Sequence, residues 1–75
     1  MRVNIYPNPV QDRLVITNTN GIEDVTIYNA LGQPIKQLVV NNEQLSIEVK
    51  DLPKGIYTVQ LRQANGATIT KQFVK

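Results

Sequence analysis

The sequence predicts an all-β domain with about seven short antiparallel strands. Several runs alternate apolar and polar residues, which is the pattern of a strand with one buried face. Turns rich in Asn, Gly and Pro separate these runs at intervals of roughly 8–12 residues. No run has the periodicity of a helix. An immunoglobulin-like β-sandwich is the architecture that best fits this pattern.

The bulk composition bounds the size and class of the domain. A chain of 75 residues is expected to form one domain, covering residues 1–75. Hydrophobic residues make up 41% and aromatic residues 5%, so Val, Ile and Leu should form most of the core. The net charge of +2 and the few aromatic rings argue against nucleic-acid binding. No apolar run approaches the roughly 20 residues of a membrane span, so we expect no direct membrane insertion.

The first three expected strands are short and lie within residues 3–28. Residues 3–6 form the first strand, which Pro7, Asn8 and Pro9 end, because a proline lacks an N–H and restricts the residue before it. Residues 13–18 form the second strand. A third strand covers residues 22–28. The side chains of these two strands expected to face inward are Leu14, Ile16, Val25 and Ile27.

The middle of the chain is less regular. Residues 29–32 form a loop in which Leu31 is expected to cap one end of the core and Gly32 to adopt a conformation closed to residues with a Cβ. Residues 33–40 form a fourth strand whose buried face is ambiguous, because residues 38–40 are all apolar. Residues 44–50 form a fifth strand. Its inward side chains are expected to be Leu45, Ile47 and Val49.

The last two strands form a hairpin from Leu52 to Lys75. Asn65-Gly66 is the strongest turn signal in the chain and is typical of a tight hairpin. The outgoing strand alternates cleanly, and its inward side chains are expected to be Tyr57, Val59 and Leu61. The returning strand does not, because Lys71 falls between Ile69 and Phe73 on one face. A β-bulge, or a lysine whose stem lies along the sheet edge, would resolve the conflict.

The hairpin segment is basic. No acidic residue follows Asp51, and the basic residues that do are Lys54, Arg62, Lys71 and Lys75, a formal charge of +4. Residues 1–51 carry a formal charge of −2. The pattern is typical of a solvated rim with lysines that oppose aggregation. A basic docking surface for an acidic partner is the functional alternative.

The residue types disfavour an enzyme and point to no cofactor or metal. The chain has no Cys or His, so Ser46 has no histidine to activate it. Glu23 and Asp24 are the only adjacent carboxylates, and neighbours on a strand point to opposite faces, which suits neither a shared proton nor a metal. A minor alternative is a calcium site of loop oxygens from Asp12, Asn18 and Asn20.

Four motifs in order resemble a known family. They are Tyr6-Pro7-Asn8-Pro9, the run from Val25 to Gln33, the run from Leu52 to Leu61, and the ending from Gly66 to Lys75. Together they resemble the type A C-terminal sorting domain of proteins exported by the type IX secretion system, also called the Por secretion system, of certain Gram-negative bacteria. The resemblance covers residues 3–75.

The resemblance implies a non-catalytic secretion signal at the end of a larger exported protein. Such domains direct an upstream cargo, in cis, through the outer-membrane translocon and are then removed by a surface sortase. The implied route runs through the periplasm to the cell surface or the medium. The family often carries an acidic residue where Asn29 stands. The positions that match the family motifs, and that we take as candidate recognition residues, are Pro7, Asn8, Pro9, Gly32, Gly55, Tyr57, Gly66, Lys71, Phe73, Val74 and Lys75.

Two other functions compete with this interpretation. A fibronectin-like module that binds carbohydrate or mediates adhesion would need an exposed aromatic platform, for which Tyr6, Tyr28 and Tyr57 are the candidates. Tyr57 is expected to face the core, which leaves two. A passive spacer that stabilises its neighbour would need no recognition residues at all.

Overall fold

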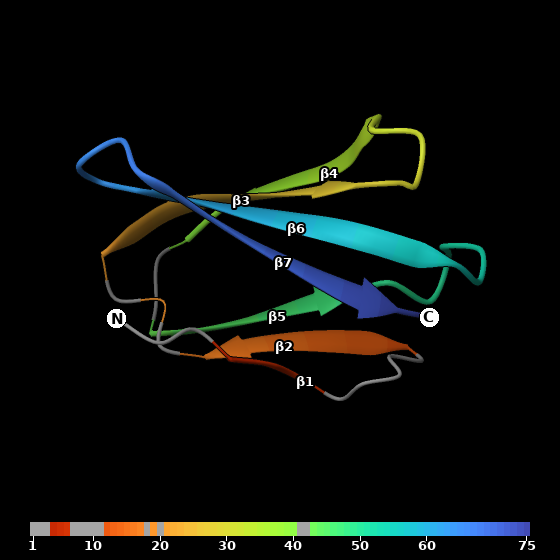
Figure 1. The fold of residues 1–75 in the computed structure, drawn as a ribbon. Helices are drawn as coiled ribbons and strands as arrows, with labels where there is room; N and C mark the ends of the chain where they lie inside the picture. The colour runs from red at the N-terminus through yellow and green to blue at the C-terminus, as the bar shows by residue number, and fades with distance from the viewer. Residues whose placement is uncertain (1–3, 7–11, 18, 20, 41–42) are drawn as a thin grey trace.

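The computed structural model of the chain describes residues 4–6, 12–17, 19, 21–40 and 43–75. The strands form two antiparallel sheets that pack face to face (Figure 1). They are β1 (Asn4–Tyr6), β2 (Arg13–Thr17), β3 (Ile22–Tyr28), β4 (Pro34–Val39), β5 (Gln44–Glu48), β6 (Ile56–Gln63) and β7 (Thr68–Val74). The all-β, immunoglobulin-like sandwich expected from the sequence is confirmed.

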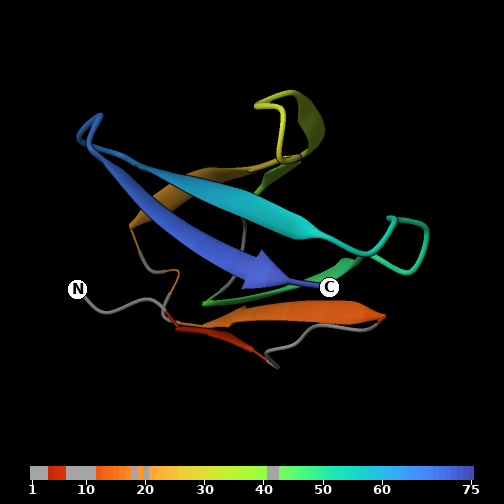
Figure 2. The same cartoon turned by 45° about the vertical axis from the view of Figure 1, so that its right-hand side comes forward.

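The order of the strands decides which of them are exposed at a sheet margin. Within the described residues, the smaller sheet has the order β1-β2-β5 and the larger sheet has the order β4-β3-β6-β7. Figure 2 shows the two sheets as separate layers, with β7 outside β6 in the upper layer. The final hairpin therefore places β7 at one margin of the larger sheet, and β4 lies at the other.

The core lies between the sheets and follows the expected alternation. Every side chain that was expected to face inward is buried, except Leu45, which is half-buried and packs against the core. Ile22 and Phe73 complete the buried apolar set. The buried apolar residues are Leu14, Ile16, Ile22, Val25, Ile27, Ile47, Val49, Tyr57, Val59, Leu61 and Phe73. In β4, whose face was ambiguous, Leu38 packs against the core and Val39 is 71% exposed.

The loop between β3 and β4 corrects one expectation. Leu31 does not cap the core, because its side chain is 83% exposed. The side chain of Asn29 fixes this loop instead: its Oδ1 accepts hydrogen bonds from the backbone N–H groups of Leu31 and Gln33, both at 3.0 Å. This arrangement leaves Leu31 at the tip. Gly32 has a φ of +83°, as expected.

Two register features also differ from the sequence-based expectations. β7 pairs with β6 without a shift from Ile56↔Val74 to Arg62↔Thr68, so the suggested bulge near Lys71 is wrong. Lys71 is exposed because β7 lies at the margin of the larger sheet and no strand among the described residues lies on its far side. A register shift occurs instead in β3, between Ile22 and Asp24. It allows Ile22 and Val25, three positions apart, both to be buried.

Candidate recognition site

The β6–β7 hairpin is closed by backbone hydrogen bonds at both ends. At the turn, the N–H of Gln63 donates to Ala67 O at 2.7 Å, and Gly66 has a φ of +92° that favours glycine. At the other end, Gly55 and Lys75 exchange both N–H···O bonds, at 3.1 and 2.9 Å. The ladder therefore includes the last residue of the sequence.

Two aromatic rings join the strands near this second end. Tyr57 and Phe73 are opposite one another in the register, and their rings stack with centroids 5.2 Å apart. Both side chains are buried, and the Tyr57 hydroxyl donates a hydrogen bond to Pro53 O in the loop before β6. The pair thus fixes both the hairpin and the loop that leads into it.

The side chain of Lys75 holds the same loop from the other side. Its Nζ donates to Lys50 O at 3.0 Å and also to Leu52 O. The N–H of Leu52 donates to Val49 O at 3.0 Å, and its side chain packs against the core. The result is a terminal cluster made of Leu52, Gly55, Tyr57, Phe73 and Lys75, which joins two segments that are far apart in the sequence.

The ladder also determines which backbone groups of β7 point away from β6. In an antiparallel pair, residues alternate between hydrogen-bonded and non-hydrogen-bonded positions. Because the pairs Gly55–Lys75 and Gln63–Ala67 are hydrogen-bonded, the residues of even number in β7 direct their N–H and C=O groups to the free margin. These residues are Thr68, Thr70, Gln72 and Val74. None is proline, so each retains a donor and an acceptor.

The charges of the hairpin are distributed differently from the sequence-based expectation. Arg62 does not join a basic surface at the end of the chain, because it pairs with acidic residues of β3: its Nε donates to Asp24 Oδ2 at 2.9 Å, and Glu23 Oε2 lies 3.3 Å from its Nη2. The hydrogen bond to Asp24 raises the pKa of Arg62 above its ordinary value. Glu23 and Asp24 were expected to point apart, yet both reach one guanidinium beside the β3 register shift.

Lysines occupy the other end of the hairpin. Lys36 pairs with Asp51 at 3.5 Å, which leaves that acidic residue already neutralised. Within the described ranges, Lys50, Lys54 and Lys71 form no ion pair, and all three are exposed. Unpaired positive charge therefore surrounds the terminal cluster. Lys50 belongs to this basic surface, whereas Arg62, which the sequence suggested for it, does not.

The structure brings some candidate recognition residues together and separates others. Gly55, Tyr57, Phe73, Val74 and Lys75 lie at one end of the hairpin, and Lys71 lies further along β7. The two remaining glycines are in other turns, Gly66 at the far end of the hairpin and Gly32 between β3 and β4. The three residues that fall outside the described ranges are Pro7, Asn8 and Pro9.

Sequence reasoning missed the role of Lys75 as a structural contact. A lysine at the end of a strand pattern is typical of a solvated rim, and nothing in the local pattern indicates that its ammonium group binds two carbonyl oxygens. The loop motif from Leu52 to Gly55 was a usable signal, since a tight loop has carbonyl groups that need donors.

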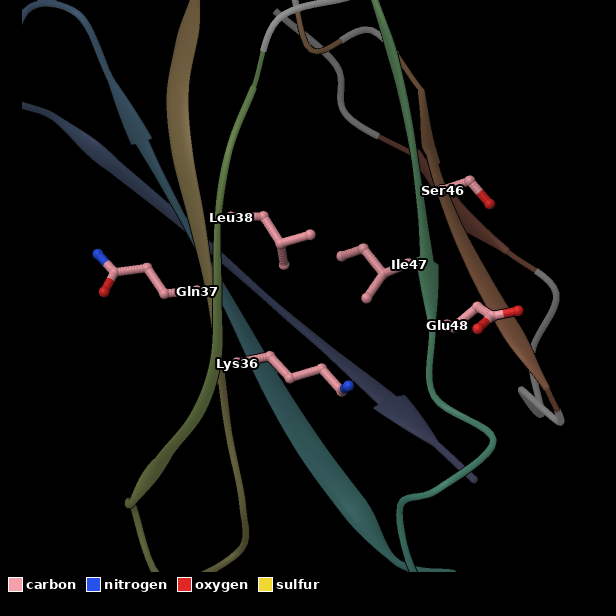
Figure 3. Close-up of a pocket in the computed structure, with 6 residues that line it drawn as sticks. All are labelled: Lys36, Gln37, Leu38, Ser46, Ile47 and Glu48. Atoms are coloured by element: carbon pink, nitrogen blue, oxygen red, sulfur yellow. The ribbon is translucent and has the colours of Figure 1, made fainter.

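A second surface feature lies on the opposite side of the sandwich. An open cavity of about 340 Å³ separates β4 from β5, and Figure 3 shows Leu38 and Ile47 pointing towards each other across it. Lys36 also points into this space, while Gln37 points away. In the described part of the chain no group of three or more Asp, Glu, His or Cys residues could hold a metal ion. Asn18 and Asn20, which the sequence suggested for a calcium site with Asp12, lie outside the described residues. The residues around this cavity do not suggest catalysis.

Two of the three candidate tyrosines give little support to a sugar-binding platform, and the side chain of the third, Tyr6, lies outside the described part of the chain. Tyr57 is buried in the core, as expected. Tyr28 is half-buried, and its hydroxyl donates to Gln60 Oε1 at 3.0 Å. Among the described residues there is also no helix long and apolar enough to cross a membrane. The hairpin margin and its terminal cluster thus remain the best candidate for a functional surface.

Comparison with known proteins shows the family of the chain. Beta-agarase A of Zobellia galactanivorans is 32% identical over 59 residues, a match that covers 76% of this chain and 11% of the relative. Beta-agarase D of the same organism is 30% identical over 73 residues, covering 97% of this chain and 15% of the relative. The chain thus spans only a small part of the length of these relatives. Residues 4–75 match the family described as the secretion system C-terminal sorting domain, and the chain belongs to this family, the type IX sorting domain that its motifs resemble.

Proposed function

We propose that the β6–β7 hairpin is the part of this sorting signal that the outer-membrane type IX translocon recognises, with β7 as the docking strand. The observation that carries the proposal is the free margin of β7, where four residues direct their backbone N–H and C=O groups outward. An exposed margin of this kind accepts an extended segment of a partner by strand addition. The terminal cluster holds the end of the strand in register before docking, which lowers the entropic cost of docking.

The rest of the function follows from the sorting role. The domain covering residues 1–75 is non-catalytic and travels with an upstream cargo in cis, for which relatives much longer than this chain leave room. After the periplasm and the translocon, a surface sortase removes the domain, leaving the cargo at the cell surface or in the medium. The domain is a substrate in this step and needs no cofactor.

The test uses proline substitutions that alter the margin without breaking the hairpin. The chain is fused behind a reporter cargo in a bacterium with type IX secretion, and Thr70→Pro and Gln72→Pro are introduced singly. Each change removes one outward N–H but leaves every β6–β7 hydrogen bond in place, since proline is tolerated where the N–H faces solvent. We expect the cargo to accumulate in the periplasm.

Gln37→Pro is the matched control. Val40 N–H donates to Glu23 O at 2.9 Å, so by the same alternation Gln37 directs its N–H away from β3, at the opposite margin of the sheet. This variant should be exported normally. If the β7 variants have the same melting temperature as the control and are exported normally, the proposed docking strand is contradicted.

A further inference from the structure

The side of β7 that faces the smaller sheet carries one charge between two apolar residues. Ile69 is half-buried, Lys71 is exposed and Phe73 is buried. Lys71 is paired with Val59 of β6, whose side chain is fully buried. Lys71 therefore lies beside the core, on the same face of the sheet as the buried residues. The lysine is exposed only because no strand lies beyond β7 among the described residues.

A strand added at this margin would change the surroundings of Lys71. The new strand would bond to the outward groups of Thr70 and Gln72, on either side of Lys71. In an antiparallel arrangement, the residue opposite Lys71 would occupy a non-hydrogen-bonded pair, the position where facing side chains are closest. The inward side chains of the added strand would cover part of Lys71 and remove water from its ammonium group. This desolvation is unfavourable unless an acceptor replaces the water.

No carboxylate in the described part of the chain pairs with Lys71 and so supplies such an acceptor. The acidic residues of β3 are paired with Arg62, Glu48 lies 3.5 Å from Arg13, and Asp51 lies 3.5 Å from Lys36. The two remaining acidic residues, Asp12 and Glu43, form no ion pair with Lys71 either. Lys71 forms no ion pair with any described residue. The acceptor has to arrive with the docking strand itself.

We propose that the strand accepted by β7 is an acidic segment of the partner, with a Glu or Asp opposite Lys71 and an apolar residue two positions away on each side. The carboxylate would satisfy Lys71, and the flanking apolar residues would extend the core beside Ile69 and Phe73. This inference rests on the proposed docking role of β7. It adds the partner's chemistry, which charge complementarity at Lys71 determines.

A second copy of the chain fits this margin less well. Two β7 strands paired antiparallel about their centres would place Lys71 opposite Lys71, and like charges in facing positions are destabilising. The lysine thus opposes self-pairing at the same position where it favours an acidic partner.

The experiment compares three synthetic peptides with blocked ends, Thr-Val-Thr-Glu-Thr-Val-Thr and its versions with Gln or Lys in place of Glu. Binding to the ¹⁵N-labelled 75-residue chain is followed by the amide shifts of Thr68, Thr70, Gln72 and Val74. We expect the Glu peptide to bind about tenfold more tightly than the Gln peptide, as one hydrogen bond between charged groups provides, and the Lys peptide to bind most weakly. Lys71→Glu should reverse this order.

Lys54→Glu is the matched charge control, because Lys54 is exposed but lies in the loop before β6 and not on β7. It should keep the wild-type order of the three peptides. Equal binding of all three through β7 would overturn the acidic preference while leaving β7 as the docking strand. Absence of binding, shifts confined to β4, or β7 shifts that depend on protein concentration alone would also overturn it. The export assay with Thr70→Pro decides the docking role separately.

Discussion

The two margins of the larger sheet differ in how well they are protected against pairing. β4 begins with Pro34, follows a register shift between Ile27 and Tyr28, and carries a half-buried Lys36 tied to Asp51 of the loop after β5. Proline, irregular register and inward charge are the usual devices that keep an edge strand from binding another chain. β7 has no proline and no register shift, and only Lys71 interrupts its inner row. In the larger sheet, the margin at β4 is therefore protected against pairing with another strand, whereas the margin at β7 is much less protected.

The comparison favours a binding role for the free margin of β7. A long, regular edge is an aggregation hazard, and a domain of this size would ordinarily protect it. The terminal cluster adds order at this same margin, through the Tyr57–Phe73 stack and the contacts of Lys75. An edge that is ordered and is protected by Lys71 alone remains open to strand addition.

The largest expected effect comes from the residue that attaches β7 to the core. Phe73→Ala would remove a side chain that is 1% exposed and stacks on Tyr57. We expect a loss of about 3–5 kcal/mol in the free energy of unfolding, enough to unfold most of a small domain. Val74→Ala, next to it and 46% exposed, is the control and should cost well under about 1 kcal/mol. Urea denaturation measures both. Similar losses for the two would mean that β7 does not depend on the core for its position.

The two turn glycines sharpen the comparison, since each closes the hairpin that leads to one margin. Gly66 has a φ of +92° and Gly32 a φ of +83°, and a Cβ added at either would meet no atom within 4 Å. Alanine at either site should therefore cost a similar amount, about 1–2 kcal/mol, for backbone conformation alone. Thermal unfolding measures the cost. We expect export to fall further with Gly66→Ala than with Gly32→Ala, and the reverse ranking would indicate that β4 matters more.

Lys75→Met tests whether the terminal cluster orders β7. The change keeps an unbranched side chain, shorter by the terminal nitrogen, but removes the hydrogen bonds to Lys50 O and Leu52 O. Because the group is partly exposed, we expect a loss of about 1 kcal/mol, with faster hydrogen exchange at Gly55 and Lys75 in particular. Lys75→Arg should restore most of the protection. Unchanged exchange in Lys75→Met would show that the ladder alone orders the last residue.

The smallest effect is expected at the turn end of the hairpin. Arg62→Gln would break the contacts with Glu23 and Asp24, but the guanidinium is at the surface and such pairs contribute little. The change should lower the melting temperature slightly at low salt and not at all at high salt, because salt screens exposed pairs. Export should be unaffected. A clear export defect would place recognition near the Asn65-Gly66 turn and not at the terminal cluster.

Local alternation was enough to predict the inner rows of most strands. Tyr57, Val59 and Leu61 are buried as the period of two requires, and the Asn65-Gly66 turn closes the expected hairpin. These features depend only on residues close in sequence. The same pattern also indicated the right architecture, since short strands with polar turns leave few alternatives to a sandwich.

The features that could not be predicted depend on the neighbours of each strand. Lys71 left a bulge and a lysine at the sheet edge as alternatives, because periodicity cannot show that β7 lies at a margin, where an inward lysine reaches water. Glu23 and Asp24 were expected to point to opposite faces, yet both reach Arg62. The register shift that brings them together arises from the pairing of β3 with β6, which the local sequence does not show. Leu31 was assigned to the core from its apolar character alone, whereas the hydrogen bonds of Asn29 determine the shape of the loop.

The joining of Lys75 to Lys50, Leu52 and Gly55 has a consequence for what a partner can distinguish. These groups come together only when β7 has paired with β6 and the loop before β6 has folded, so the linear sequence of β7 is insufficient to form them. A partner that binds this arrangement would not bind an unfolded or misfolded chain. Recognition would then also report that the domain has reached its native fold.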